Sequence, residues 1–403
     1  MALIVQKYGG SSVADIEKIK FVAKKVVETK RKGNKVVVVV SAMGKTTDNL
    51  ISLAKHIMPN PPEKELDLLL STGEIVSVAL LCMAIESYGE QAEGFPGYFA
   101  GIKTDTLHTK ARIQKIEPSK IIEELNKDKI VVVAGFQGIS SENSITTLGR
   151  GGSDLTAIAI SGAIKADICE IYTDVEGVYT ADPNRVENAK LISVISYDEL
   201  LEMASSGAKV MQSRAVEFAK KYKVPFYVKS TFKNTEGTMV KEMELKEGAV
   251  VSSVSIDENQ AKISIFKVPD KPGIAGKIFS ALGEAGINVD VIVQNVGRDN
   301  SADISFTVNI NDMEKAKNIV EKIGKEIGAE KVITDSDICK VSIIGIGMMN
   351  QPGVAGKMFN CLAKSGINIE MISTSEIKIS CVIRKKDGQK ALTQLHKEFI
   401  ENK

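Results

Sequence analysis

A glycine-rich turn at residues 149–154, GRGGSD, brings together residue types that could bind a small anionic molecule. Its three glycines free the backbone, and Arg150 and Asp154 place opposite charges beside it. The apolar, small-residue run that begins at Leu155 predicts a helix, whose N-terminus would offer unpaired N–H groups and a positive dipole end to an anion. A tight strand-to-helix turn with a solvated ion pair is the plainer interpretation, so the rest of the chain has to decide.

Four other stretches combine glycine with polar residues. They are KYGGSS at 7–12, SAMGKTTD at 41–48, STGE at 71–74 and TDVEGVYTADP at 173–183. Lys7 ends a short apolar run shortly before two glycines, which favours a phosphate-binding role over that of a surface lysine. A P-loop is excluded because its first glycine would fall at Val39, inside a strand. A dinucleotide-binding turn is excluded because Asp154 replaces its third glycine.

The elements that must position these residues alternate between strands and helices. Apolar runs at 3–7, 35–40, 130–134, 169–173 and 225–230 predict strands. Helical spacing marks the segments 16–30, 71–89 and 198–222. This order predicts an α/β domain with a mainly parallel sheet sandwiched by helices. Because ligands bind at the carboxyl ends of such strands, the glycine loops after residues 7, 40, 134 and 148 should converge on one crevice.

An internal repeat occupies the C-terminal part of the chain. PGIAGKIFSALGEAGIN at 272–288 aligns without gaps with PGVAGKMFNCLAKSGIN at 352–368, with ten identities in seventeen positions and an offset of 80 residues. Each copy reads as strand, helix, two strands and helix, but only the first adds a final strand, at 331–334. We predict that a spare strand at 250–256 completes the second copy, because an open sheet edge invites aggregation.

The composition excludes several other classes of protein. Apolar residues make up 43% of the 403 residues and charged residues 26%, with a net charge of +1, so neither nucleic acid nor a membrane is an expected partner. The five cysteines and three histidines show no metal-ligand spacing, and no protein metal site is expected. The N-terminus resembles no signal peptide, and scattered cysteines fit a cytoplasmic protein with reduced thiols.

Together, the five motifs and the repeat resemble the aspartokinases of the amino acid kinase family, whose regulatory region is a pair of ACT domains. The resemblance covers nearly the whole chain and leaves no room for the homoserine dehydrogenase portion of bifunctional members. It implies an amino acid kinase-like catalytic domain at 1–237 and a first ferredoxin-like βαββαβ ACT domain at 261–336. The second ACT domain would combine 249–257 with 338–403.

The implied reaction transfers the γ-phosphoryl group of ATP to the side-chain carboxylate of L-aspartate. It gives 4-phospho-L-aspartate, the first step toward lysine, threonine and methionine. A carboxylate with an ordinary pKa of about 3.9 is already ionised at neutral pH, so no general base is needed. The chemistry instead requires positioning and fixed positive potential. Lys7 and Asp154 are the expected catalytic residues.

The resemblance also implies which residues bind the two substrates. Those expected to bind ATP are Lys7, Gly9, Gly10, Ser11, Ser41, Thr173, Asp174, Tyr179, Asp182, Arg185 and Lys209. Those expected to bind aspartate are Thr47, Glu74, Arg150 and Ser153. Mg²⁺ is expected on the ATP phosphates, mostly through water and phosphate oxygens, with no assigned protein ligand.

We expect specific roles for Arg150, Glu74 and Asp154, and for Glu74 and Asp154 a purely structural role is an alternative. Arg150 should bind the substrate α-carboxylate bidentately. Glu74 should bind the substrate ammonium group, unless it only complements the dipole at a helix N-terminus. Asp154 should pair with Lys7 or with the substrate ammonium group, and it could also be a helix N-cap.

The first ACT copy is expected to bind an amino-acid effector, lysine or threonine or both, with lysine favoured. Its expected effector residues are Asp270, Ile274, Ala275, Asn288, Val289, Asp290 and Gln294. The second copy should complete the pocket across an interface through Val354, Asn368 and Ile369. ACT modules generally pair sheet to sheet, so we expect at least a homodimer, or a tetramer. A module used only for dimerisation is the alternative.

Two other functions remain open on the sequence. One is a kinase for another amino acid, such as glutamate. The other is a non-catalytic amino-acid sensor that kept the ACT pair. The presence of Lys7, Arg150 and Asp154 disfavours the sensor, and we expect a feedback-regulated aspartate kinase.

Overall fold

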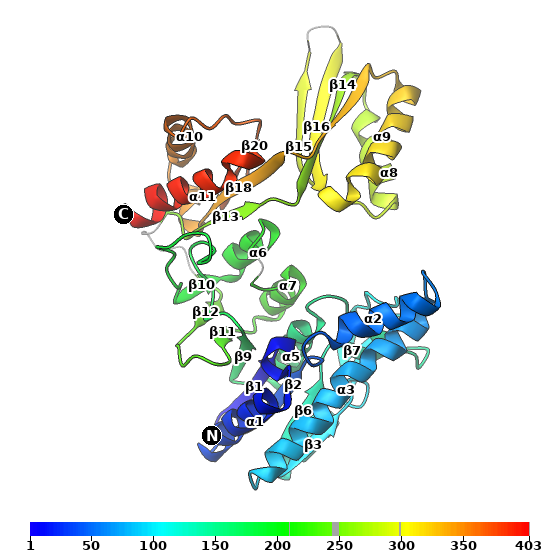
Figure 1. Ribbon diagram of the computed structural model, residues 1–403, viewed down its shortest axis with the longest axis vertical. Helices are drawn as coiled ribbons and strands as arrows, with labels where there is room; N and C mark the ends of the chain where they lie inside the picture. Colours follow the sequence, from blue (N-terminus) through cyan, green and yellow to red (C-terminus); the bar gives the residue numbers. More distant parts are fainter. Residues whose placement is uncertain (209, 244–249, 298–299, 403) are drawn as a thin grey trace. The chain divides into compact units, whose positions relative to one another are not determined.

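The computed structural model describes residues 1–208, 210–243, 250–297 and 300–402 (Figure 1). The chain forms two compact units. The first consists of Met1–Val178, Leu191–Ala204 and Lys209–Glu244, and the second of Tyr179–Lys190, Ser205–Ala208 and Leu245–Lys403. Two short segments inside the predicted catalytic domain, 179–190 and 205–208, therefore belong to the second unit.

An eight-stranded sheet forms the centre of the first unit, in the order β10-β12-β11-β9-β1-β2-β6-β3. Its strands are β1 (Leu3–Tyr8), β2 (Lys35–Val40), β3 (Ala92–Phe95), β6 (Ile130–Ala134), β9 (Ile168–Thr173), β10 (Val194–Ser196), β11 (Phe226–Ser230) and β12 (Thr238–Lys241). All neighbouring pairs are parallel except β11 and β12. The apolar runs of β2 and β6 are buried because helices cover both faces. The predicted mainly parallel sheet is confirmed.

The helices of this unit pack on opposite faces of the sheet. They are α1 (Ile16–Arg31), α2 (Thr46–Ile57), α3 (Glu63–Ser87), α4 (Ser119–Asn126), α5 (Gly152–Ile164), α6 (Tyr197–Ser205) and α7 (Ser213–Tyr222). Tyr8 and Val40 share a buried cluster with residues of α1 and α3. Because side chains alternate along a strand, Lys7 points to the other face, where α5 packs against β1, β2 and β9.

Two helices differ from their predicted bounds. The helix predicted over 198–222 is broken into α6 and α7. Gly207 has a φ of +102° in the break, and a Cβ there would lie 2.3 Å from the Ile256 carbonyl oxygen. The helix predicted from Ser71 begins at Glu63, directly after Pro62.

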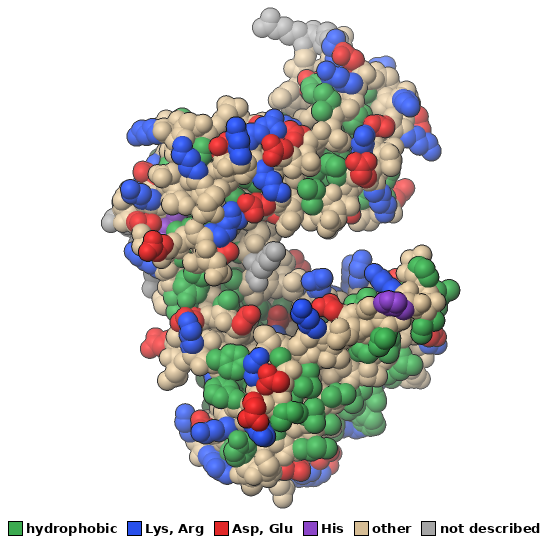
Figure 2. All heavy atoms as spheres, in the orientation of Figure 1, with side chains coloured by type: hydrophobic (Ala, Val, Ile, Leu, Met, Phe, Trp, Pro, Cys, Tyr) green, Lys and Arg blue, Asp and Glu red, His purple; other side chains and the backbone are tan. Residues whose placement is uncertain are grey.

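Helix α3 is more apolar than we expected for a chain with no membrane partner. By length and composition alone it could cross a bilayer. One side of it, with Val78, Leu81 and Ile85, is buried in the cluster shared with α1 and the sheet. The other side exposes Val76 and Met83. Figure 2 shows hydrophobic side chains gathered on the surface in the region of α3. The buried side is typical of a core helix.

A smaller four-stranded sheet leads into α5. Its strands are β4 (Ile102–Thr104), β5 (Ile113–Ile116), β7 (Gln137–Ser140) and β8 (Ile145–Thr147), in the order β5-β4-β7-β8. Strand β8 ends immediately before the 148–151 loop, which enters α5 at Gly152. The small sheet therefore fixes one end of the GRGGSD turn.

The second unit contains two four-stranded antiparallel sheets. The first has the order β15-β16-β14-β17, from β14 (Gln260–Pro269), β15 (Val289–Val296), β16 (Ser301–Asn309) and β17 (Lys331–Asp335), with α8 (Ile274–Glu284) and α9 (Met313–Ile327). The second has the order β13-β18-β20-β19, from β13 (Ser253–Asp257), β18 (Ile338–Ile344), β19 (Met371–Thr374) and β20 (Lys378–Arg384), with α10 (Val354–Lys364) and α11 (Gly388–His396). Both copies are ferredoxin-like.

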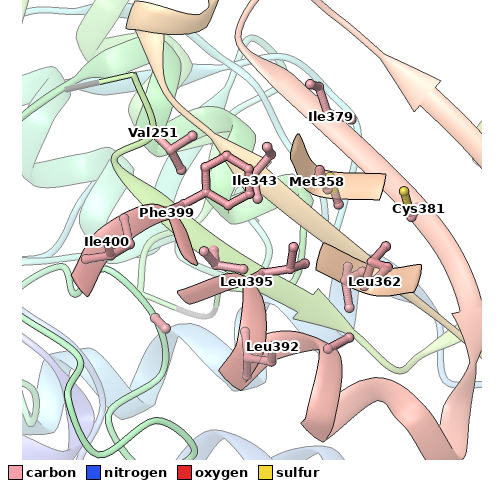
Figure 3. Close-up of a cluster of buried hydrophobic side chains, with 14 of the residues drawn as sticks. Val251, Ile343, Met358, Leu362, Ile379, Cys381, Leu392, Leu395, Phe399 and Ile400 are labelled. Atoms are coloured by element: carbon pink, nitrogen blue, oxygen red, sulfur yellow. The ribbon is translucent and has the colours of Figure 1, made fainter. Parts of the chain in front are cut away.

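The spare strand completes the second copy, as predicted. Strand β13 pairs antiparallel with β18, in the place that β17 takes beside β14 in the first copy. The core of this second copy gathers side chains from β18, β20, α10 and α11, including Ile343, Leu362 and Leu395 (Figure 3). Ala181 and Val186 of the 179–190 segment belong to the same cluster. This shared burial explains why that segment joins the second unit.

Charged side chains join the two ferredoxin-like modules. Lys340 of β18, which is 1% exposed, pairs with Asp290 of β15. Arg384 of β20 lies 2.6 Å from Asp335 of β17. Lys340 is buried, whereas Asp290 and Arg384 remain more than a third exposed, so only the Lys340 charge is withdrawn from water and depends on its partner in the other module.

Candidate active site

The carboxyl ends of neighbouring parallel strands lie level at one edge of the large sheet. Tyr8 is in register with Val40 on one side and Tyr172 on the other. The ladder continues one residue further, since the Ser41 N–H donates to the Tyr8 carbonyl at 3.1 Å and the Gly135 N–H to the Val40 carbonyl at 2.9 Å. The loops after β1, β2 and β6 therefore begin side by side, as their glycines predicted.

Lys7 and Asp154 form an ion pair at this edge. The Lys7 Nζ lies 2.6 Å from the Asp154 carboxylate, and the two side chains are 10% and 13% exposed. Asp154 is in the first turn of α5, where a negative charge favours the helix dipole. Gly151, with a φ of 69°, is the N-cap, so the interpretation of Asp154 as the cap is wrong. The two predicted catalytic side chains are thus brought together from residues 147 positions apart in the chain.

The start of α5 lies very close to the backbone at the end of β6. A Cβ at Gly135 would lie 2.7 Å from the Ser153 Oγ. Ser153 itself is buried. Only glycine at the end of β6 lets the helix N-terminus come this near the strand ends. The predicted substrate residue Ser153 therefore lies at the same edge as the Lys7–Asp154 pair.

Glu74 is a buried carboxylate next to the end of β2. Its Oε1 accepts the Ala42 N–H at 3.1 Å, and its Oε2 has no hydrogen-bond partner among the described residues. Burial raises the pKa of Glu74 to about 7. Because Glu74 lies near the middle of α3, its interpretation as a charge at a helix N-terminus is wrong. A buried acceptor with a spare oxygen is suited to a cationic group.

The other predicted substrate residues are more accessible. Arg150 is exposed on the turn before α5. Thr47 is half-buried in the first turn of α2, and Ser41, half-buried, follows β2. Ser11 is exposed in a 3₁₀ turn that begins at Gly10. Their exposure leaves these side chains able to contact a ligand, because they are not packed in the hydrophobic core.

The predicted ATP residues from the end of β9 onward fall into three sets. Thr173 and Asp174 lie at the end of β9, where the Thr173 hydroxyl donates to the Asp174 carboxylate at 3.0 Å. Tyr179, Asp182 and Arg185 belong to the second unit. There the Arg185 guanidinium pairs with Glu258 at 3.0 Å and donates to Gln389 at 2.8 Å. Lys209 lies outside the described residues.

Sequence reasoning missed Asp67, His108 and Arg214, which hold the base of the GRGGSD turn. A signal for the first of them was present. Between residues 66 and 85 the only acidic side chains are Asp67 and Glu74, seven positions apart. That spacing puts both on one helix face in an otherwise uncharged stretch. Both prove to be buried.

The donor set at this edge fits Mg²⁺ only as an ion carried by the nucleotide. Among the described residues, no group of three His, Cys, Asp or Glu side chains could hold a metal. The carboxylates at this edge are Asp154, already paired with Lys7, Glu74, and Asp174 directly after β9. Mg²⁺ commonly keeps several waters and binds substrate phosphates, which agrees with this arrangement.

A separate cleft of about 330 Å³ lies in the first ferredoxin-like module. Four of the predicted effector residues line it, namely Asp270, Ile274, Ala275 and Gln294. The remaining predicted effector residues lie elsewhere. Asn288 and Asn368 are exposed, Val289 packs with the first core, Asp290 pairs with Lys340, and Val354 and Ile369 pack with the second core.

Comparisons with known proteins agree with this architecture. A model described as the amino acid kinase family matches residues 2–230, and ACT domain models match 263–327 and 341–399. The chain is 48% identical to an aspartokinase of Mycolicibacterium smegmatis, covering 99% of this chain and 96% of that protein. It is 50% identical to an aspartate kinase of Pseudomonas putida, covering 99% and 98%.

The fold is also that of a solved structure, E. coli aspartokinase III in complex with lysine and aspartate. The TM-score is 0.79 at 23% identity, covering 99% of each chain. The matches define an amino acid kinase followed by two ACT domains. Within that class, the chain belongs to the aspartokinases, the ATP-dependent kinases of aspartate.

Proposed function

We propose that phosphoryl transfer to aspartate takes place at the carboxyl edge of the large sheet, beside Lys7 and Asp154. The observation that carries this proposal is their buried 2.6 Å ion pair at the end of β1. A side-chain oxygen of aspartate attacks the γ-phosphorus of ATP, and a new O–P bond forms. The bond to the β–γ bridging oxygen breaks, and ADP leaves with that electron pair. The product is 4-phospho-L-aspartate, and no proton has to move.

Lys7 supplies positive charge to the transferring phosphoryl group. An ammonium group has three N–H donors, so one can serve Asp154 while the others reach phosphate oxygens. Asp154 orients Lys7 and does not act as a base. Fixed charge in a site with little water lowers the barrier more than the same charge in solution. Gly9, Gly10, Ser11, Ser41, Thr173 and Asp174 surround the nucleotide phosphates, and Mg²⁺ binds there with ATP.

The aspartate substrate is held by groups on three sides. Arg150 binds its α-carboxylate, because a planar guanidinium matches a carboxylate with two parallel hydrogen bonds. Glu74 binds its ammonium group through the oxygen that has no partner within the described chain. Ser153 and Thr47 complete the contacts. Tyr179, Asp182, Arg185 and Lys209 remain predicted nucleotide residues.

An acyl phosphate reacts with hydroxylamine, and this reaction tests the proposal. Purified enzyme with ATP and Mg²⁺ should form a hydroxamate with aspartate but not with glutamate. Absence of aspartate-dependent product would contradict the proposed function and favour a non-catalytic sensor. Arg150→Ala should raise the KM for aspartate at least tenfold, with a smaller change in kcat. An unchanged KM would refute the role of Arg150.

The cleft of the first ACT module is the proposed effector site. Its strand-to-helix turn supplies backbone N–H groups for a carboxylate, and Asp270 can hold an ammonium group. Lysine is the proposed effector, because E. coli aspartokinase III, which has the same fold, has been solved with lysine. We further propose that the enzyme is cytoplasmic, that it serves lysine, threonine and methionine synthesis, and that it dimerises through its ACT modules. Calorimetric titration with lysine and with threonine tests the effector, and light scattering tests the dimer.

A further inference from the structure

The turn that carries Arg150 is anchored by a buried carboxylate on α3. Asp67 is 0% exposed. It accepts the Thr147 hydroxyl at 2.5 Å and the Thr109 N–H at 3.0 and 3.1 Å. The Nδ1 of His108 lies 2.8 Å from the same carboxylate. One side chain thus joins α3 to the end of β8 and to the 108–109 turn, which are far apart in the chain.

The contact with Thr109 reaches the glycine turn directly. Thr109 has a φ of 62°, a left-handed conformation that a β-branched residue adopts only when its surroundings hold it there. Its N–H is bound by Asp67. Its carbonyl oxygen would lie 3.2 Å from a Cβ on Gly149, so Thr109 is in contact with the residue before Arg150. Asp67 therefore holds Thr109 in place, and Thr109 in turn contacts the turn at Gly149.

A second charged side chain also holds the residues that lead into the turn. Arg214 of α7 donates to the Leu148 carbonyl at 2.7 Å and to the Ala111 carbonyl at 2.5 Å. The Ala111 N–H in turn donates to the Thr147 carbonyl at 2.9 Å. Thr147 and Leu148, the two residues before Gly149, are thus held from α3 and from α7. A turn with three glycines would otherwise be free to adopt many conformations.

We infer that Asp67 is a positioning residue for aspartate binding. It holds Thr147 and Thr109 so that Arg150 is presented before the substrate arrives, and it does not touch the substrate itself. If the turn is ordered before aspartate binds, less of the binding free energy is lost in ordering it. The KM for aspartate is therefore lower. This inference rests on the proposed role of Arg150.

The sharpest test changes one hydroxyl group. Thr147→Val is nearly isosteric and removes the donor to Asp67, whereas Thr147→Ser keeps it. Thr147→Val should raise the KM for aspartate at least fivefold, with kcat and the KM for ATP within twofold. Thr147→Ser should restore the KM for aspartate to near the wild-type value. Asp67→Asn should raise the same KM at least tenfold.

A matched control separates positioning from loss of stability. Glu124 of α4 is also a buried carboxylate, paired with Lys127 and Lys129 at 2.7 Å each, away from the turn. Glu124→Gln should leave the KM for aspartate within twofold. The inference is overturned if Thr147→Val behaves like Thr147→Ser. It is also overturned if both KM values rise together or if Glu124→Gln has the same effect.

A double-mutant cycle keeps this inference distinct from the proposed function. In the Arg150→Ala background, Thr147→Val should raise the KM for aspartate less than twofold further, because the effect passes through Arg150. A fully additive effect would overturn the inference. If Arg150→Ala alone leaves the KM for aspartate unchanged, the proposed role of Arg150 fails first. If Arg150→Ala raises it and Thr147→Val does not, only the positioning role fails.

Discussion

The edge of the large sheet and the cleft of the first ACT module are both built from glycine turns between a strand and a helix, but they handle charge differently. At the sheet edge, Lys7 and Asp154 are buried and already paired. In the cleft, Asp270 and Lys271 are exposed to solvent. The first region holds its charges in place before any ligand binds, whereas the second leaves them hydrated.

The difference in charge burial fits the two proposed functions, catalysis at the sheet edge and effector binding in the cleft. Phosphoryl transfer needs charges whose positions do not relax during the reaction, and these are worth most where water is excluded. An effector site needs reversible binding, and exposed charges give modest free energies because solvent screens them. We therefore expect changes at the sheet edge to alter turnover strongly and changes in the cleft to alter affinity moderately.

The largest effect is expected from Lys7→Met. Turnover in the hydroxamate assay should fall at least about 1000-fold, because the positive charge on the transferring group is lost. Stability should fall by about 3 kcal/mol, since Asp154 is left buried without its partner. The double variant Lys7→Met with Asp154→Asn should regain stability in thermal unfolding but not turnover. Effector binding by calorimetry should be unchanged in both, and a change would contradict the separation of the two regions.

The next effect is expected from Asp270→Ala in the cleft. The dissociation constant for the effector should rise at least about tenfold, because the ammonium group loses its partner. The kcat without effector should stay within twofold. The matched control is Gln351→Ala in the same turn of the second copy, which does not line the cleft. Equal losses of affinity in the two variants would show that both copies bind the effector.

A smaller effect follows from the protonation of Glu74. Because burial raises the pKa of Glu74 to about 7, the free enzyme carries a neutral Glu74 below that pH and an ionised one above it. If the ionised form binds the substrate ammonium group, kcat/KM for aspartate should rise as pH increases from 6 to 8. Glu74→Gln should lower this value and flatten the profile. A profile that stays the same in Glu74→Gln would contradict the assignment.

The raised pKa of Glu74 should also affect stability. As pH increases, the free energy of unfolding should fall, whereas kcat/KM should rise. The folded chain keeps the Glu74 proton between pH 4.5 and about 7, while the unfolded chain loses it. The free energy of unfolding should therefore decrease across this window in the wild type relative to Glu74→Gln. Denaturant titrations at several pH values measure the difference.

The smallest effect is expected where the two ACT copies are alike. A Cβ at Gly276 in α8 or at Gly356 in α10 would have no described atom within 4 Å outside its chain neighbours and its own helix backbone. Replacing either glycine by alanine should stabilise its helix by up to about 1 kcal/mol, with the same sign in both copies. Thermal unfolding of the two variants checks this. Opposite signs would show that the helices, and not only the turns, distinguish the copies.

Local patterns predicted much of the fold and part of the site. The β-branched runs of β2 and β6 and the glycines after them were enough to predict a parallel sheet with loops at one edge. The repeat at 272–288 and 352–368 predicted two similar modules and left one strand over. These signals are local in sequence because periodicity and turn residues act within a few positions.

The misses came from long-range packing. Glu74 was placed at a helix start because α3 begins earlier than its polar STGE stretch suggested. The effector role of Asp290 stays a prediction, but its ion pair with Lys340 of the other module was not predicted. The spacing of Asp67 and Glu74 in an apolar stretch marked them as one helix face, but it did not name Thr147 or Thr109 as the partners of Asp67. In each case the partner is distant in the chain, so no local pattern could name it.

The sequence by itself determined the type of protein, the order of its domains and the identity of the charged residues Lys7, Arg150 and Asp154. Tertiary structure decided which of these meet. Lys7 reaches Asp154 only because β1 lies between β2 and β9 and alternates its side chains toward α5. The position of Arg150 depends on contacts from α3 and α7 to the base of its turn. Spacing along the chain shows which residues share a face of a helix or strand. The distances between side chains from different elements, which make a site, depend on how those elements pack.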